Sequence, residues 1–249
     1  MPVFARHDAA EDDLLSAIDD VIKDLLRCHD VGSPPVDAVR LLQACGKSAR
    51  ASAQKARSKR SSGLRDRRPA RSVARDVSQP RAAAIIGRSL TRAILRRTQF
   101  ERSRASHDSE GWLDFLFTAR LLMPTRWFRE DFRRLGLDVQ RLHARYSTAS
   151  AEAVAWRLLD LEEPLVVTIF DNNQIVDRRS NVQHDGVPPT IDFAELAAQA
   201  YAHTYSRPRL ENSPAVTARA WSVHRADWRR EIVVARLDGE SSKIAAWED

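Results

Sequence analysis

Apolar residues recur every three or four positions along much of the first 160 residues, the spacing that places them on one face of a helix. The first such stretch runs from Glu11 to Cys28, with leucine, isoleucine and valine on one side and acidic residues largely on the other. The same spacing predicts further helices over residues 36–45, 85–96, 110–123, 138–146 and 152–159. Pro124 ends the helix that begins at Glu110, and Ser150 caps the helix that begins at Glu152.

The pattern changes after Pro164. Residues 165–170 form an apolar run, and the turn Asp171-Asn172-Asn173 leads to a returning strand over 174–177, which predicts a hairpin. The other expected elements are a helix over 192–201 and strands over 71–77, 216–223, 229–237 and 241–247, the last two joined around Asp238 and Gly239. We therefore predict an α+β protein, with a mostly helical domain over residues 1–160 and a small α+β module over residues 161–249.

Composition bears on the cellular compartment in which the chain is expected to lie. Of the 249 residues 43% are hydrophobic and 30% are charged, and no apolar run approaches the length of a membrane span. Residues 1–20 are acidic rather than a basic segment followed by an apolar one, so no secretory signal is expected. Without such a signal, Cys28 and Cys45 are expected to be reduced core residues rather than a disulfide. The sequence thus predicts a cytoplasmic protein with no membrane partner.

Positive charge is concentrated in one segment. Lys47–Arg104 holds 18 Lys and Arg residues against three acidic residues, whereas the rest of the chain is net acidic. One interpretation is a phosphate-binding surface that contacts nucleic acid. The other is a solvated connection that is rich in arginine for reasons unrelated to binding. Both interpretations stay open from the sequence alone.

Two stretches of the chain resemble a known family. Gly87–Leu95 reads G-R-S-L-T-R-A-I-L, and the helix that follows reads E-G-W-L-D-F-L-F-T-A-R-L-L-M-P from Glu110 to Pro124. These resemble two helices of the ImmA/IrrE family of zinc metallopeptidases, A-H-E-L-G-H-A-L-L and E-x-x-A-N-x-F-A-A-x-L-L-M-P. The run P-P-V-D-x-V-x-L-L at residues 34–42 and the A-x-x-x-R-L at residues 153–158 follow the family as well.

The resemblance implies a zincin-like N-terminal domain with a small sheet, and it implies where the zinc site would stand. The two zinc-binding histidines fall on Arg88 and Arg92, and the catalytic glutamate falls on Ser89. The glutamate of the second helix falls on Gly111 if no gap is allowed. Glu110 is one residue away, and with Asp114 it forms an E-x-x-x-D pair on one helical face.

The family's chemistry needs groups that this chain lacks at those positions. Two neutral imidazoles at i and i+4 hold Zn²⁺, and a carboxylate takes a proton from the metal-bound water. Arginine stays protonated and has no lone pair to donate, and none of the seven histidines forms an i,i+4 pair or a His-Glu dipeptide. The sequence therefore predicts no bound metal, no cofactor and no metallopeptidase activity. Arg88 and Arg92 either pair with Glu110 and Asp114 across the vacated site or, with Arg96, line a solvated groove.

Three functions of different classes remain. The first is a non-catalytic ImmA/IrrE homologue that regulates transcription in a stress or mobile-element response by binding a helix-turn-helix repressor. The second is a nucleic-acid-binding regulator that uses the basic segment of residues 47–104. The third is a residual hydrolase with atypical residues, such as Ser89 as a nucleophile near His107. The resemblance also implies a sensor-like C-terminal module, whose sequence contains no recognisable ligand-binding motif.

The first prediction concerns the metal content of the purified protein. We expect well under one equivalent of zinc by elemental analysis, because two permanent cations occupy the positions of the histidine pair. Stoichiometric zinc that disappears when Glu110 or Asp114 is mutated would contradict the loss of the site.

Overall fold

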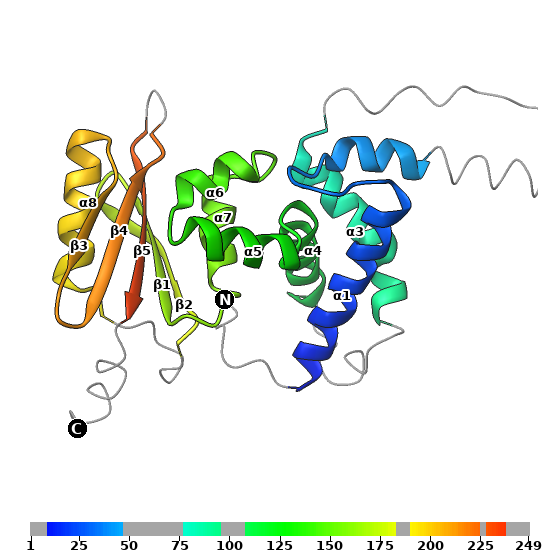
Figure 1. Cartoon of the computed structure of the whole chain (residues 1–249), viewed down its shortest axis with the longest axis horizontal. Helices are drawn as coiled ribbons and strands as arrows, with labels where there is room; N and C mark the ends of the chain where they lie inside the picture. The colour runs from blue at the N-terminus through cyan, green and yellow to red at the C-terminus, as the bar shows by residue number, and fades with distance from the viewer. Residues whose placement is uncertain (1–8, 47–76, 96–107, 183–189, 225–227, 238–249) are drawn as a thin grey trace, which may run out of the picture. The chain divides into compact units, whose positions relative to one another are not determined.

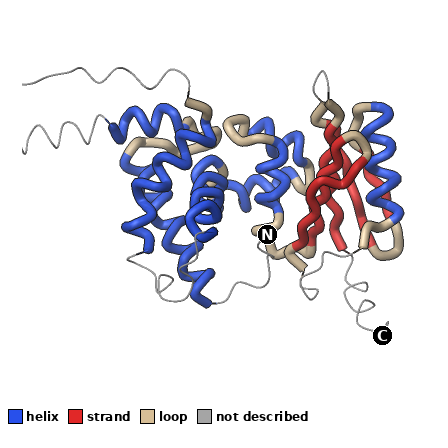
Figure 2. Tube along the Cα trace, turned by 180° about the vertical axis from the view of Figure 1, so that it is seen from behind, coloured by secondary structure: helices blue, strands red, loops and turns tan. Residues whose placement is uncertain are grey.

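The computed structural model describes residues 9–46, 77–95, 108–182, 190–224 and 228–237 (Figure 1). These residues form two compact units, one over Ala9–Phe128 and a second that begins at Arg129. Figure 2 shows the described strands gathered in the second unit and helices alone in the described part of the first. No helix within the described ranges is long and apolar enough to cross a membrane.

The first unit is built from helices. They are α1 (Ala9–Cys28), a helix over residues 38–46, α3 (Gln79–Leu95), α4 (Asp108–Leu122) and the first turn of α5 (Thr125–Leu135). In α1, Leu14, Ile18 and Ile22 are almost fully buried, while Asp20, Lys23 and Asp24 face solvent, as the helical spacing predicts. At the end of α4, Leu121, Leu122 and Met123 add to the same core.

A polar cluster ties α1 to α4 within this core. The guanidinium of Arg120, only 6% exposed, donates from Nη1 to Oδ2 of Asp19 at 2.6 Å and to the hydroxyl of Thr125 at 3.1 Å. The Thr125 hydroxyl in turn donates to Oδ1 of Asp19 at 2.8 Å. A buried guanidinium needs such acceptors, because transferring its charge out of water is costly. The cluster therefore fixes which faces of α1 and α4 meet.

The second unit contains a five-stranded antiparallel sheet in the order β2-β1-β5-β4-β3. Its strands are β1 (Leu165–Asp171), β2 (Gln174–Ser180), β3 (Arg209–Asn212), β4 (Val216–Ser222) and β5 (Arg230–Leu237), and its helices are the rest of α5, α6 (Val139–Arg145), α7 (Ala151–Leu158) and α8 (Phe193–Tyr205). Asp138, Ser150 and Asp192 cap the last three helices with side-chain oxygens.

The two faces of the sheet are covered differently. On one face, Ala194, Ala198 and Ala202 of α8 lie in a core with the apolar residues of β1, β4 and β5 (Figure 1). On the other, Arg230 of β5 pairs with Asp171 of β1 at 2.6 Å and with Glu152 of α7. Small alanines let α8 lie close to the strands, whereas α7 is joined to the sheet through charged groups as well as apolar contacts.

The α+β class predicted from the sequence is confirmed, and most elements stand where the pattern placed them. β2 extends to Ser180 and α8 to Tyr205, beyond the predicted ends. β3 was not predicted, because its sequence R-L-E-N has little apolar character and is ordered by pairing with β4. The strand predicted at 229–237 pairs with β1 and β4; residues 241–247 and 71–76 lie outside the described residues.

Helices α6 and α7 belong to the same compact unit as the sheet, so the boundary between the units lies within α5. The division into domains over residues 1–160 and 161–249, drawn from the change of pattern after Pro164, stays a prediction.

The Asp19–Arg120 pair yields a stability prediction. Asp19→Ala removes the carboxylate that pairs with the buried guanidinium and leaves it the Thr125 hydroxyl. We expect the free energy of unfolding to fall by roughly 2–3 kcal/mol, less than the roughly 3–5 kcal/mol for a fully buried pair, because Asp19 is 32% exposed. Asp24→Ala is the matched control, since it removes an exposed i,i+3 pair with Arg27 and should change stability by less than about 0.5 kcal/mol. Chemical unfolding of both variants measures the difference. Equal effects would show that Arg120 does not depend on Asp19.

Candidate functional site

The position of α3 is fixed at its first residue. Gln79 donates from Nε2 to Oδ1 of Asp37 at 3.0 Å, and its Oε1 accepts from the backbone N–H of Val39 at 3.3 Å. Asp37 also caps the 38–46 helix by accepting from the N–H of Arg40 at 2.9 Å. That backbone hydrogen bond, followed by the one from Gln79, lowers the pKa of the Asp37 carboxyl below its usual range. The start of α3 is thus tied to the start of the 38–46 helix.

Nine residues into α3, the backbone lies against an aromatic ring of α4. A Cβ atom placed on Gly87 would stand 2.8 Å from Cδ1 and 3.0 Å from Cγ of Phe117. Phe117 itself is 2% exposed, with buried Ile86 beside the glycine on α3. Only a residue without a side chain permits so close an approach without displacing the ring. Gly87 and Phe117 therefore set the distance between the two helices.

This approach brings Arg88 of α3 to Asp114 of α4. Nη1 of Arg88 donates to Oδ2 of Asp114 at 3.0 Å, which is a charge-assisted contact between two of the positions that the family resemblance assigned to the zinc site. The Arg88 side chain is 61% exposed and the Asp114 side chain 22% exposed. Pairing across the two helices was one of the two alternatives that the sequence left open, and the structure has it between Arg88 and Asp114. The pair lies at the surface, where it stabilises the fold by no more than about 1 kcal/mol.

Ser89 is held in a different way. Its hydroxyl donates to the carbonyl oxygen of Ile86 at 2.6 Å, a bond to its own helix. In that arrangement the proton points at the backbone rather than at a base, which is unlike an activated nucleophile. Arg92 and Glu110 lie in α3 and α4, but their side chains, like residues Arg96 and His107, lie outside those that the structure describes.

The described side chains at this site do not fit zinc. The guanidinium of Arg88 is a hydrogen-bond donor to Asp114 and has no lone pair for a metal. Among the described residues, no group of three or more His, Cys, Asp or Glu side chains is placed to hold a metal ion. What the arrangement offers is an exposed basic group beside a carboxylate that is 22% exposed; Phe115, the residue after Asp114 in α4, is 41% exposed.

The second unit contains buried charged groups that the sequence did not single out. Glu195 of α8, 1% exposed, accepts from both Nη atoms of Arg178 on β2, at 2.6 and 2.8 Å. It also accepts from the backbone N–H of Asp192 and completes a capping box. The D-x-x-E spacing at the start of α8 was the available signal for this role.

Glu231 of β5 is the second such group, with no exposed surface. Its oxygens contact Nδ1 of His203 at 2.9 Å and accept from Nε2 of Gln199 at 3.1 Å, and Nδ1 of His224 lies 3.6 Å away. No local signal marks Glu231, because it occupies an inward position of a strand that otherwise reads as apolar. These contacts satisfy a buried carboxylate and join α8 to β5.

Comparison with known proteins adds a likeness in fold. No family model and no curated protein matches the chain. Among solved structures, the chain is similar to a Mycobacterium tuberculosis transcriptional regulator, with a TM-score of 0.54 and 16% sequence identity, over 95% of this chain and 81% of that chain. At this identity the likeness shows a shared fold alone, and it does not show the ImmA/IrrE family in particular.

The contact at Gly87 can be tested by a single methyl group. Gly87→Ala places Cβ 2.8 Å from Cδ1 of Phe117, closer than van der Waals contact allows. We expect the free energy of unfolding to fall by about 1–2 kcal/mol, because the cost of overpacking exceeds the roughly 1 kcal/mol gain in helix propensity. Gly46→Ala is the control, since nothing lies within 4 Å of its Cβ. Adding Phe117→Leu to Gly87→Ala should recover part of the loss. A Gly87→Ala variant as stable as wild type would place the helices farther apart.

Proposed function

We propose that this chain is a non-catalytic homologue of the ImmA/IrrE metallopeptidases that regulates transcription by binding a helix-turn-helix repressor. The observation that carries the proposal is the Arg88–Asp114 contact between α3 and α4. An arginine stands where the resemblance expects a zinc-binding histidine, and its charge is neutralised by a carboxylate of the facing helix. An ion pair thus takes the place that a metal would occupy between the two helices.

The absence of catalysis in this proposal follows from the residues at the site. Water activation needs a Lewis acid or a general base, and Arg88 supplies neither. Ser89 is engaged with the Ile86 carbonyl, so a hydrolase based on Ser89 has no support from its geometry. The regulatory part of the proposal draws on the fold shared with the transcriptional regulator, and the repressor partner draws on the family resemblance.

A surface that has lost its metal can still hold a peptide segment. Arg88 and Asp114 offer a donor and an acceptor within 3.0 Å of each other, and Phe115 offers an exposed apolar ring one residue further along α4. Polar groups of both signs beside an aromatic ring can contact both the backbone and an apolar side chain of a bound segment. This is the surface we assign to the repressor.

Measured binding of the purified protein to a panel of small helix-turn-helix repressors tests the proposal. We expect wild type to bind one of them, Asp114→Arg to lose binding about tenfold or more through like-charge repulsion with Arg88, and Arg133→Glu on α5 to bind as wild type. Cleavage of the bound repressor by purified protein contradicts the non-catalytic reading. Binding that is insensitive to Asp114→Arg contradicts the assigned surface.

Restoring the family's residues tests the alignment on which the proposal rests. Arg88→His, Ser89→Glu and Arg92→His together should create a face that binds zinc, with Asp114 or Glu110 as third ligand. Metal binding should appear before activity does, since hydrolysis also needs a positioned water and supporting hydrogen bonds. Adding Gly111→Glu shows which register α4 uses. If neither variant binds zinc in calorimetry while both keep their circular dichroism spectrum, the assignment of the site is wrong.

A further inference from the structure

The side of α8 that faces solvent carries no charged side chain. Between Asp192 and Arg207 the only Asp, Glu, Lys or Arg is Glu195, which is buried and bonded to Arg178. The solvent side instead presents Phe193, which is 79% exposed, and Leu196, which is 44% exposed. We call Phe193, Leu196, Ala197, Ala200 and Thr204 the outer face of α8, because all five lie on the side opposite the alanines that contact the sheet.

The outer face also lacks free polar groups. Its one hydroxyl, on Thr204, donates to the carbonyl oxygen of Ala200 at 2.9 Å and so leaves its methyl group to solvent. A helix at a protein surface ordinarily has a polar side toward water, whereas a helix that is apolar on both sides is typical of one buried between two layers. One layer, the sheet, is present for α8. The second layer is missing from the described structure.

The distribution of large and small residues on this face fits a second copy of itself. Phe193 and Leu196 stand in the N-terminal half of the helix, while Ala200 and Thr204 stand in the C-terminal half. If two copies pack antiparallel about Ala200, Leu196 of each lies over Thr204 of the other, and Phe193 of each lies over Arg207 of the other. This is the self-complementarity that a two-fold interface requires.

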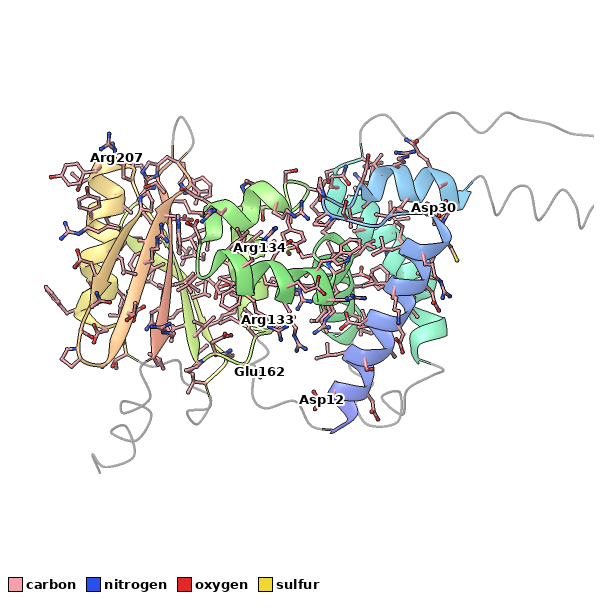
Figure 3. All side chains as sticks on the ribbon, viewed as in Figure 1. Asp12, Asp30, Arg133, Arg134, Glu162 and Arg207 are labelled. Atoms are coloured by element: carbon pink, nitrogen blue, oxygen red, sulfur yellow. The ribbon has the colours of Figure 1, made fainter. Side chains whose placement is uncertain are left out.

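Charge at the two ends of the helix selects the same arrangement. Asp192 stands at the N-terminal end, and Arg207 projects from the C-terminal end, as Figure 3 shows. In an antiparallel pair centred near Ala200, each Asp192 faces the partner's Arg207, and the two helix dipoles oppose each other favourably. A parallel pair would instead set Asp192 against Asp192 and Arg207 against Arg207.

We propose that the outer face of α8 is a homodimer interface, in which two copies pair antiparallel about a two-fold axis near Ala200. A 13-residue helix is about 20 Å long, so a contact between two such helices falls at the small end of specific interfaces. The dimer is accordingly concentration-dependent. This inference is independent of the repressor-binding surface on α3 and α4, and neither depends on the other.

Sedimentation of the full chain at increasing concentration tests the interface. Wild type should shift from monomer to dimer, and Leu196→Glu should raise the dissociation constant about tenfold or more by placing two carboxylates in an apolar contact. Leu210→Glu is the matched control, since Leu210 on β3 is 53% exposed. Arg209 lies over Tyr201 of α8, and successive side chains of a strand point to opposite faces of the sheet, so Leu210 lies on the face away from α8. A monomer at every concentration, or equal weakening by both substitutions, overturns the proposal.

Cysteine crosslinking tests the register without relying on affinity. In a Cys28→Ser, Cys45→Ser background, Ala200→Cys should form an intermolecular disulfide, because the two copies of this position face each other near the axis. Thr204→Cys should not, since its two copies stand about 12 Å apart along the helices. Crosslinking through position 204 alone, or equally through both positions, overturns the antiparallel pairing. Circular dichroism verifies that each variant is folded.

Discussion

At Gly87 the backbone of α3 lies against the ring of Phe117, and the geometry of the candidate site follows from this contact. Any side chain larger than hydrogen would push α3 from α4, because protein cores are packed too tightly to absorb an extra methyl without strain. Held at this distance, Arg88 reaches Asp114 across the two helices. The site is therefore defined by a packing constraint first and by electrostatics second.

The electrostatics at the site are modest, and that bears on what the site does. Arg88 is mostly exposed, so its pairing with Asp114 contributes little to the stability of the fold. An exposed pair keeps its donors and acceptor available to another molecule. The Arg120–Asp19 pair in the same unit shows the contrast, because the Arg120 guanidinium is buried and bonded to Asp19 and Thr125. In this unit the buried Arg120 therefore supports the fold, whereas the exposed Arg88 can contact another molecule.

The second unit places its charges in the opposite way. Glu195 and Glu231 lie in the layer between α8 and the sheet, where Arg178, His203 and Gln199 satisfy them. Because the charged groups of α8 are turned inward, its outward side is left apolar. The same helix thus anchors the sheet through polar contacts and offers solvent an apolar surface, which is the reverse of the usual arrangement for a surface helix.

The sequence by itself determined the class of the fold, and it proposed a location for the candidate site. Helical spacing and strand runs are local signals, and they placed α1, α4, α7, β1 and β5 within a few residues of their observed bounds. The contact between Arg88 and Asp114 is one of the two arrangements that the sequence left open, because the family resemblance set their two helices against each other but did not decide between pairing and a solvated groove. Tertiary structure alone decided the rest. β3 forms because β4 supplies hydrogen bonds that its polar sequence does not predict, and Glu231 is buried because residues distant along the chain, Gln199 and His203, bond to it. The outer face of α8 could not be read from its sequence either, because an alanine-rich helix looks the same whether one side or both sides are covered.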